Sequence, residues 1–205
     1  PEVITGWGDD ENVASSIDYD GNSNIQVLAF DAAKYSESDG SNIDDITNSM
    51  NSSEIYVTTI IDGNKVTKKL TSDSESDSTP VVYVNGNKAA VLWQKGSYDI
   101  DGETGSFGYK NGDSLWYSVF DGKDWSSPKV LEDGAIGTTQ SYDVALASDG
   151  TIMALTSKSA NYNDELNSRE IVSYLVKDGN VLREQVTNNN IPETQPKVTV
   201  YNNNG

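Results

Sequence analysis

The sequence of 205 residues repeats one pattern of segments three times. Each copy opens with an alternating apolar segment, closes it with a turn dipeptide, and continues with a second apolar segment. The dipeptides are Asp20-Gly21, Asn85-Gly86 and Asp149-Gly150. They supply the positive φ angles that tight hairpins need. Self-similarity at a fixed period is the signature of repeat architectures, so this feature restricts the fold more than any other.

Each copy also contains a second hairpin. After a longer polar stretch, a third apolar segment is followed by a turn and a more polar fourth segment. The third segments are 54–61, 114–120 and 170–176; the fourth are 65–70, 124–131 and 181–186. Two hairpins in a repeat of about 60 residues predict a four-stranded antiparallel blade, and blades in series make a β-propeller. The first segment is expected to be the innermost strand, and the polar fourth segment suits an outer edge.

We therefore predict an all-β protein, a β-propeller with three full blades plus partial blades at both ends. The predicted blades cover about 13–71, 79–131 and 140–187, with orphan strands at 1–5 and 196–201, all within one region 1–205. A β-sandwich also has many short strands, but it has no reason to repeat a four-strand pattern. Helical periodicity is weak, and its best candidate, Ile43–Met50, lies in a predicted loop and is not assigned to an element. Phe30, Trp93 and Trp116 lie on predicted inner strands and are expected in the core.

An arc of three blades and two orphan strands leaves long sheet edges exposed, which proteins normally avoid. The sequence thus predicts part of a larger propeller. We expect the chain to self-associate or to pair with the remainder of a parent protein.

Composition excludes several classes of partner and cofactor. The 32 acidic and 14 basic residues give a net charge of −18, which repels phosphate backbones, so nucleic acid is not an expected partner. Cysteine and histidine are absent, which removes thiolate zinc ligands and the commonest catalytic base. We expect no zinc, haem or nucleotide. No apolar run approaches the roughly 20 residues of a membrane span. The acidic surface suits solubility outside the cell, in a secreted or bacterial cell-surface protein.

The segment Ser118-Val119-Phe120-Asp121-Gly122-Lys123-Asp124-Trp125 resembles the Asp-box repeat of sialidase-like propellers. Residues 59–66 have the same spacing without the aromatic residue. Asp121 stands one place later than in the usual pattern, and the third copy keeps only Asp178-Gly179. The resemblance implies a hairpin between third and fourth strands, held by the Ser and Asp, with the Trp between blades. More generally, the chain is similar to Asn/Asp-rich propeller repeats of secreted bacterial surface proteins.

The catalytic residues of that family do not carry over to this chain. A sialidase-like site needs an arginine cluster to bind a carboxylate, whereas the sequence has only Arg169 and Arg183. Arg183 lies on a predicted outer strand, far from any central site. No catalytic residue is assigned, and the balance is against an enzyme.

The long connections of the chain are expected to share one face of the propeller. They are 31–53, 94–113 and 157–168, with 71–78, 132–138 and 187–193. Long loops on a rigid scaffold commonly carry binding sites, although they can also be solvated insertions. Tyr98, Phe107, Tyr109 and Tyr162 lie on these loops. Such aromatics suit sugar stacking or a protein contact, or they pin the loops to the sheet.

A calcium site is predicted at Asp99, Asp101 and Glu103. Alternate carboxylates beside a glycine turn can converge on one hard cation. The segment lacks the glycine at position six and the glutamate at position twelve of an EF-hand, so a solvated acidic loop is the alternative. Residues 18–24 have a similar composition but fall on a predicted hairpin, where Asp and Asn favour the turn.

The leading functional hypothesis is a non-catalytic binding module that recognises carbohydrate or protein through its acidic, aromatic-bearing loops. The alternatives are a fragment of a propeller glycoside hydrolase and a structural spacer without a ligand.

Overall fold

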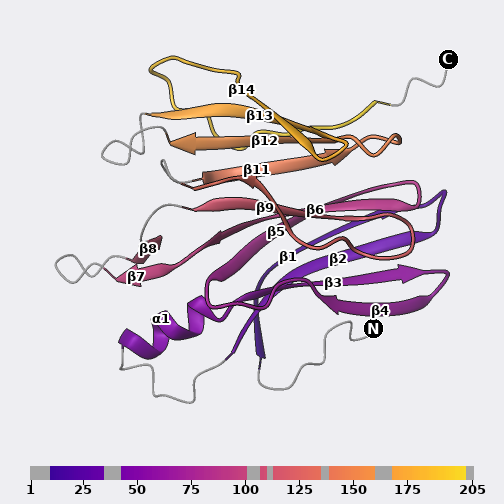
Figure 1. Ribbon diagram of the computed structural model, residues 1–205, viewed down its shortest axis with the longest axis horizontal. Helices are drawn as coiled ribbons and strands as arrows, with labels where there is room; N and C mark the ends of the chain where they lie inside the picture. The colour runs from indigo at the N-terminus through magenta and orange to yellow at the C-terminus, as the bar shows by residue number, and fades with distance from the viewer. Residues whose placement is uncertain are drawn as a thin grey trace.

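A computed structural model describes residues 10–34, 43–100, 107–109, 113–134, 139–159 and 168–201. It contains three four-stranded antiparallel sheets, which lie one after another along the chain (Figure 1). In the first and third sheets the strands follow each other in sequence order. The predicted all-β fold of four-stranded propeller blades is confirmed. We call the three sheets blades 1, 2 and 3.

The strands have the following bounds. Blade 1 contains β1 (Asp10–Asp20), β2 (Ile25–Lys34), β3 (Glu54–Ile61) and β4 (Asn64–Lys69). Blade 2 contains β5 (Ser76–Asn85), β6 (Lys88–Gly96), β9 (Ser114–Phe120) and β10 (Lys129–Glu132). Blade 3 contains β11 (Thr139–Leu146), β12 (Ile152–Ser159), β13 (Arg169–Lys177) and β14 (Asn180–Gln185). A small ribbon, β7 (Tyr98–Ile100) with β8 (Phe107–Tyr109), extends from blade 2.

The hydrophobic core lies between the blades, because each sheet has an apolar residue set on both faces. One cluster joins blade 1 to blade 2, and Trp93 at its centre has no exposed surface. A second cluster joins the opposite face of blade 2 to blade 3 through residues such as Leu92 and Tyr174. Phe30 is buried as expected, whereas Trp116 is only partly buried.

The first strands of neighbouring blades contact each other, which places them closest to the propeller axis. Side chains on β1 accept hydrogen bonds from backbone N–H groups of β5 and of the turn that follows it. The pairs are Ser16 with Val82 (3.3 Å), Asp18 with Val84 (2.7 Å) and Asp20 with Gly86 (3.1 Å). Asp20 also accepts from the N–H groups of Asn22 and Ser23, so residues 18–24 form the structural turn that was predicted.

Trp125 anchors blade 2 against blade 1. Its side chain is almost fully buried, its ring lies 5.5 Å from that of Phe120, and its Nε1 donates to Thr59 Oγ1 at 2.9 Å. In the preceding turn, Asp121 Oδ1 accepts from the N–H groups of Lys123 and Asp124. The assignment of this turn to the Asp-box stays a prediction.

The structure differs from the sequence prediction at residues 43–51 and in the fourth strand of blade 2. Helix α1 (Ile43–Asn51) forms where a loop was expected, with Asp44 and Asp45 in its first turn, where carboxylates favour the helix dipole. In blade 2 the regular fourth strand covers only Lys129–Glu132, because Trp125 makes an isolated bridge to Phe120 and the following Ser126 bonds to Ser118 and Val119.

The predicted orphan strands have different outcomes. Residues 1–5 lie outside the described residues. Residues 196–201 belong to no sheet within the described structure. Among the described helices, none has the length and apolar character needed to cross a membrane.

Candidate functional site

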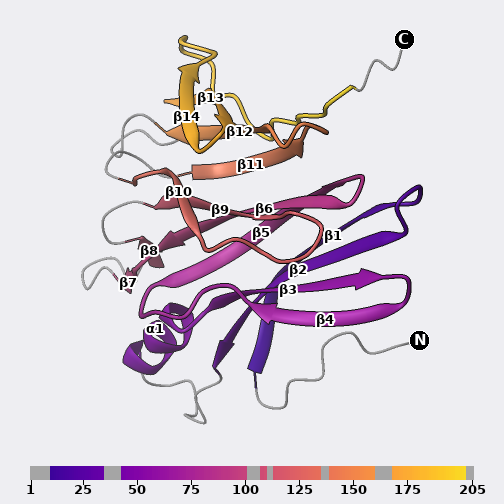
Figure 2. The ribbon, with the colours of Figure 1, turned by 45° about the vertical axis from the view of Figure 1, so that its right-hand side comes forward.

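The long connections gather at one edge of the blades, which we call the loop edge. It contains α1, the β7–β8 ribbon and the connection from β4 to β5, opposite the short hairpin turns (Figure 2). Asn51, at the end of α1, fixes the ribbon to the helix. Its Oδ1 accepts from the Tyr98 N–H at 2.7 Å, and its Nδ2 donates to the Tyr98 carbonyl at 3.1 Å.

The ribbon contains three of the predicted ligand-binding residues. Its register sets Tyr98 opposite Tyr109 and Phe107 opposite Ile100. The Tyr98 side chain is half-buried. The side chains of Phe107 and Tyr109, and the whole of Tyr162, lie outside the described residues.

Only one of the three predicted calcium ligands, Asp99, lies in the described part of the chain. Asp99 is exposed on β7, and its Oδ1 accepts from the Ile100 N–H at 2.9 Å. Asp101 and Glu103 lie outside the described residues. Among the described residues, no group of three acidic side chains is placed to hold a metal ion.

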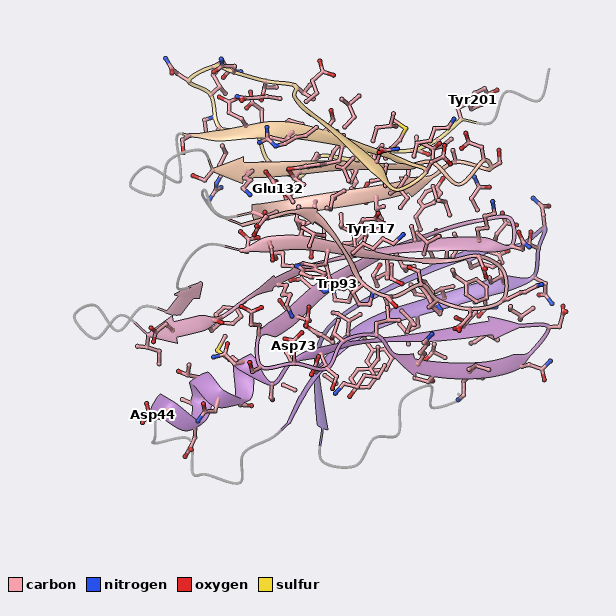
Figure 3. All side chains as sticks on the ribbon, viewed as in Figure 1. Asp44, Asp73, Trp93, Tyr117, Glu132 and Tyr201 are labelled. Carbon is pink, nitrogen blue, oxygen red and sulfur yellow. The ribbon has the colours of Figure 1, made fainter. Side chains whose placement is uncertain are left out.

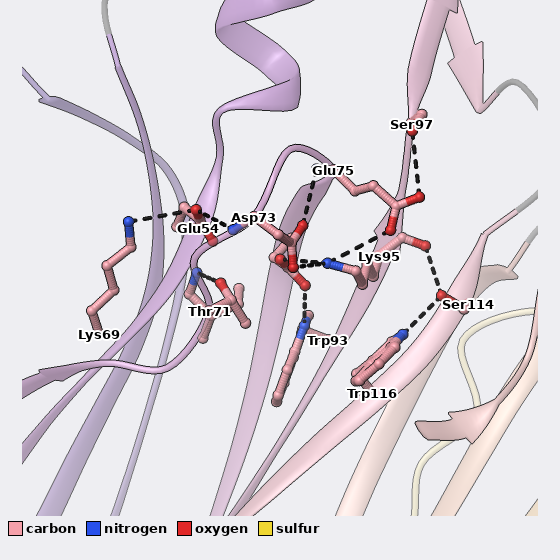
Figure 4. Close-up of polar contacts among 12 residues, drawn as sticks. Glu54, Lys69, Thr71, Asp73, Glu75, Trp93, Lys95, Ser97, Ser114 and Trp116 are labelled. Carbon is pink, nitrogen blue, oxygen red and sulfur yellow. Dashed lines mark hydrogen bonds and ion pairs between the residues drawn. The ribbon is translucent and has the colours of Figure 1, made fainter. Parts of the chain in front are cut away.

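Beside the ribbon, one lysine is surrounded by three carboxylates. Lys95, at the end of β6, is almost fully buried, and its Nζ lies 2.5 Å from Asp73, 3.1 Å from Asp77 and 3.7 Å from Glu75 (Figure 4). Figure 3 labels Asp73 and the nearby Trp93 on the ribbon. Trp93 donates from Nε1 to Asp77 Oδ1 at 2.6 Å. We call these five residues the Lys95 cluster.

Burial and hydrogen bonding act in opposite directions on the two central groups of the cluster. Desolvation raises the pKa of Asp77 to about 6, against the opposing effects of Lys95 and the Trp93 hydrogen bond. Desolvation also disfavours the charge on Lys95, but the hydrogen bonds with Asp73 and Asp77 outweigh it and raise the lysine pKa. Lys95 therefore stays charged while Asp77 titrates near neutral pH.

Trp116 contacts Lys95 on the other side of the cluster. Lys95 Nζ lies 5.6 Å from the centre of the Trp116 ring, within range of a cation–π contact. Trp116 Nε1 donates to Ser114 Oγ at 2.9 Å, and that hydroxyl donates to the Lys95 carbonyl at 3.0 Å (Figure 4). Ser97 Oγ is 3.5 Å from Glu75.

The members of the cluster differ in their access to solvent, and this decides their chemistry. Asp77 has no exposed surface, so a substrate cannot reach its carboxyl despite the raised pKa. The side chains of Asp73 and Glu75 are 47% and 48% exposed and can contact a ligand. The cluster was missed from sequence. Its signal was the alternation of Ser with Asp and Glu over 72–78, which sets every second side chain on one face of an extended segment.

The arginine on the outer strand is already bound. Glu132 accepts from Arg183 Nε at 3.1 Å and from the Tyr174 hydroxyl, and Lys158 Nζ lies 3.3 Å away. Burial of the Tyr174 hydroxyl and its hydrogen bond to Glu132 raise the pKa of that phenol. The prediction that Arg183 lies on an outer strand is confirmed, since β14 is at the end of the sheet order.

No family model and no curated protein sequence matches the chain. Among solved structures, it is similar to an N-acetylgalactosamine deacetylase from F. plautii in complex with blood group B trisaccharide. That likeness has a TM-score of 0.51 and 14% identity, and it covers 89% of this chain and 53% of that one. It is also similar to a Trypanosoma rangeli sialidase in complex with sialic acid (TM-score 0.48, 15% identity, 85% and 30% covered). A third is a Penicillium chrysogenum α-L-arabinanase complexed with arabinobiose (TM-score 0.42, 12% identity, 78% of this chain and 44% of that one covered). The chain thus spans about half of the first of these proteins, and that likeness supports the fold.

Proposed function

We propose that this chain is a non-catalytic module that binds carbohydrate at its loop edge. The observation that carries the proposal is the aromatic ribbon: Tyr98 and Tyr109 are cross-strand neighbours, and Asn51 holds their strands against α1. Because Asn51 fixes the backbone of Tyr98, an aromatic side chain at this position loses little conformational entropy when a ligand stacks on it.

The neighbouring polar groups suit a sugar. The half-exposed carboxylates of Asp73 and Glu75 lie at the same edge and can accept hydrogen bonds from hydroxyl groups. Apolar faces with a few fixed polar groups are the usual lining of small-ligand sites. The structurally similar deacetylase was solved with a trisaccharide, which supports this ligand class for the present fold. The excess of 32 acidic over 14 basic residues supports a secreted or bacterial cell-surface location.

The ionisable groups of the described residues favour binding without turnover. The Asp77 carboxyl, whose pKa is strongly raised, is fully buried, so a substrate cannot contact it. The Arg183 side chain is paired with Glu132. We expect the purified chain to hydrolyse neither sialosides nor aryl glycosides. Turnover that disappears when Asp73 or Glu75 alone is changed would instead favour the alternative, a part of a propeller glycoside hydrolase.

A glycan array followed by calorimetry tests the proposal. Tyr98→Ala is expected to weaken binding of any positive glycan at least about tenfold, the effect of losing a central aromatic contact. Tyr19→Ala is the matched control, because Tyr19 is 62% exposed and adjoins the β1–β2 turn on blade 1. The proposal fails if no glycan binds, or if the two variants weaken binding equally.

A further inference from the structure

Residues 186–195, which follow blade 3, form the same pattern of hydrogen bonds as residues 70–79, the connector between blades 1 and 2. In both connectors a backbone N–H donates to the carbonyl of the first isoleucine of the third strand, and a threonine hydroxyl accepts from the N–H of that isoleucine. The first pair is Leu70 N–H to Ile55 O (2.8 Å) and Val186 N–H to Ile171 O (2.8 Å). The second is Ile55 N–H to Thr71 Oγ1 (2.9 Å) and Ile171 N–H to Thr187 Oγ1 (2.8 Å).

The match continues to the end of the connector. A glutamate at equivalent positions accepts from the backbone: Glu54 from Asp73 N–H (3.0 Å) and Glu170 from Asn189 N–H (2.8 Å). Four residues later, Asp77 N–H donates to Ser53 O (2.9 Å) and Glu193 N–H to Arg169 O (3.1 Å). Each connector ends at a residue with positive φ before a proline, Thr79 (56°) and Gln195 (55°). Glu193 therefore occupies the position of Asp77.

Beyond the connector, residues 196–201 lie against blade 3 as β5 lies against blade 1. Val198 N–H donates to Asp143 Oδ2 on β11 at 3.0 Å, as Val82 N–H donates to Ser16 Oγ on β1 at 3.3 Å. The two segments differ in one respect. β5 pairs with β6, whereas residues 196–201 pair with no strand in the described structure.

The outer face of blade 3 is apolar and uncovered. Met153 and Val186 are 39% and 57% exposed. The register of the sheets makes them the counterparts of Ala90 and Leu131 in blade 2, which are 0% and 6% exposed because blade 3 covers them. The same positions are thus a buried interface on one blade and an open surface on the next.

We propose that residues 196–201 and the outer face of blade 3 bind a polypeptide segment of three consecutive antiparallel strands, equivalent to β6, β9 and β10. The first strand of the segment pairs with residues 196–201, as an extended peptide adds to a sheet edge. The rest covers Met153 and Val186. A complete blade from a second copy does not fit this place, because its own first strand would occupy the position that residues 196–201 already hold.

Glu193 adds a chemical requirement to the partner. In blade 2 the equivalent Asp77 is bound by Trp93 and Lys95 from the neighbouring strand β6. The Glu193 carboxylate accepts from Thr187 Oγ1 at 3.0 Å and from Asn189 Nδ2 at 2.7 Å, and an incoming strand with an indole and a lysine two residues apart would add two further donors to it.

A segment with the sequence of Lys88–Glu132 is the probe, added to the full chain and measured by calorimetry. We expect saturable binding that Met153→Asp weakens at least about tenfold, because a carboxylate would be buried without a partner. Val66→Asp is the matched control: Val66 is 66% exposed on β4 of blade 1, away from this face. Glu193→Gln should also weaken binding, whereas a Lys95→Met segment should lose that sensitivity.

Disulfide trapping tests the register, since the chain has no cysteine of its own. Thr199 is equivalent to Tyr83, which pairs with Ala90 in blade 2, so Thr199 should lie opposite Ala90 of the bound segment. Thr199→Cys should cross-link to a segment with Ala90→Cys and not to one with Val91→Cys, whose side chain points to the other face.

Saturable binding with this register and the Met153→Asp effect supports the proposal. Absence of binding overturns it, as does binding that Val66→Asp weakens equally. Concentration-dependent dimerisation of the chain alone that Met153→Asp abolishes, without capture of the segment, also overturns it in favour of a second copy. Because carbohydrate binding is scored separately through Tyr98, failure here leaves the function proposed for the loop edge untouched.

Discussion

Removing the ionisable group at Asp77 should change how the stability of this protein depends on pH. The carboxyl is fully buried, and its pKa is raised to about 6 from the usual 3.8. The folded state therefore holds this proton more tightly than the unfolded state does. At about 1.36 kcal/mol per pKa unit, the difference corresponds to about 3 kcal/mol.

The sign follows from proton linkage. Between pH 3.8 and about 6 the folded protein binds more protons at Asp77 than the unfolded chain, so stability falls as pH rises through this window and then levels off. Asp77→Asn keeps an oxygen that accepts from Trp93 Nε1, and Lys95 keeps Asp73. Relative to the unchanged protein, the variant should gain about 3 kcal/mol between acid and neutral pH.

Urea unfolding followed by tryptophan fluorescence at several pH values from 4 to 7.5 measures this difference. Comparing the two proteins at each pH cancels the titration of the other carboxylates. Glu75→Gln is the matched control, because its carboxylate lies near Lys95 but is about half exposed. If the Asp77→Asn and unchanged proteins lose stability in parallel across the range, the buried carboxyl does not titrate as argued.

Three further results are expected. Trp125→Phe should lower the free energy of unfolding by about 1 kcal/mol through loss of the hydrogen bond to Thr59, and Trp125→Ala by about 3–5 kcal/mol, both measured by urea unfolding. Gly122→Ala should cost about 1–3 kcal/mol, because φ is +100° and the new Cβ would lie 2.7 Å from Asn87 Nδ2; a variant as stable as the parent would contradict this. Calcium should raise the melting temperature and a chelator lower it, with Asp101→Ala removing the difference; a melting curve indifferent to both additives would exclude the proposed ion.

The blade architecture was predictable because it rests on local signals. The turn dipeptides recur beside alternating segments, and β3 and β9 have the predicted bounds of 54–61 and 114–120. α1 was not predictable in the same way. It is a nine-residue helix with few apolar positions, and its stability depends on contacts with β7 and β2 that sequence periodicity does not show.

The candidate site was predictable in its location but not in its central residues. The length of the connections indicated the loop edge, and Tyr98 lies there on a fixed ribbon. Lys95 could not be singled out, because an isolated lysine at a strand end is common and its carboxylates come from another segment. Only the fold brings Asp73, on the connection into β5, and Asp77, at the start of β5, to the end of β6.

The hydrogen bonds between β1 and β5 have a consequence for how such repeats can diverge. Ser16, Asp18 and Asp20 act through side chains, so each position tolerates few replacements. Their partners Val82 and Val84 on β5 contribute only a main-chain N–H, which every residue except proline possesses, whereas Gly86 in the following turn also has a φ of 60° that favours glycine. Mutational drift should therefore be unequal across this contact: slow on the accepting strand, and on the donating strand limited only by the fit of each side chain to its own surroundings.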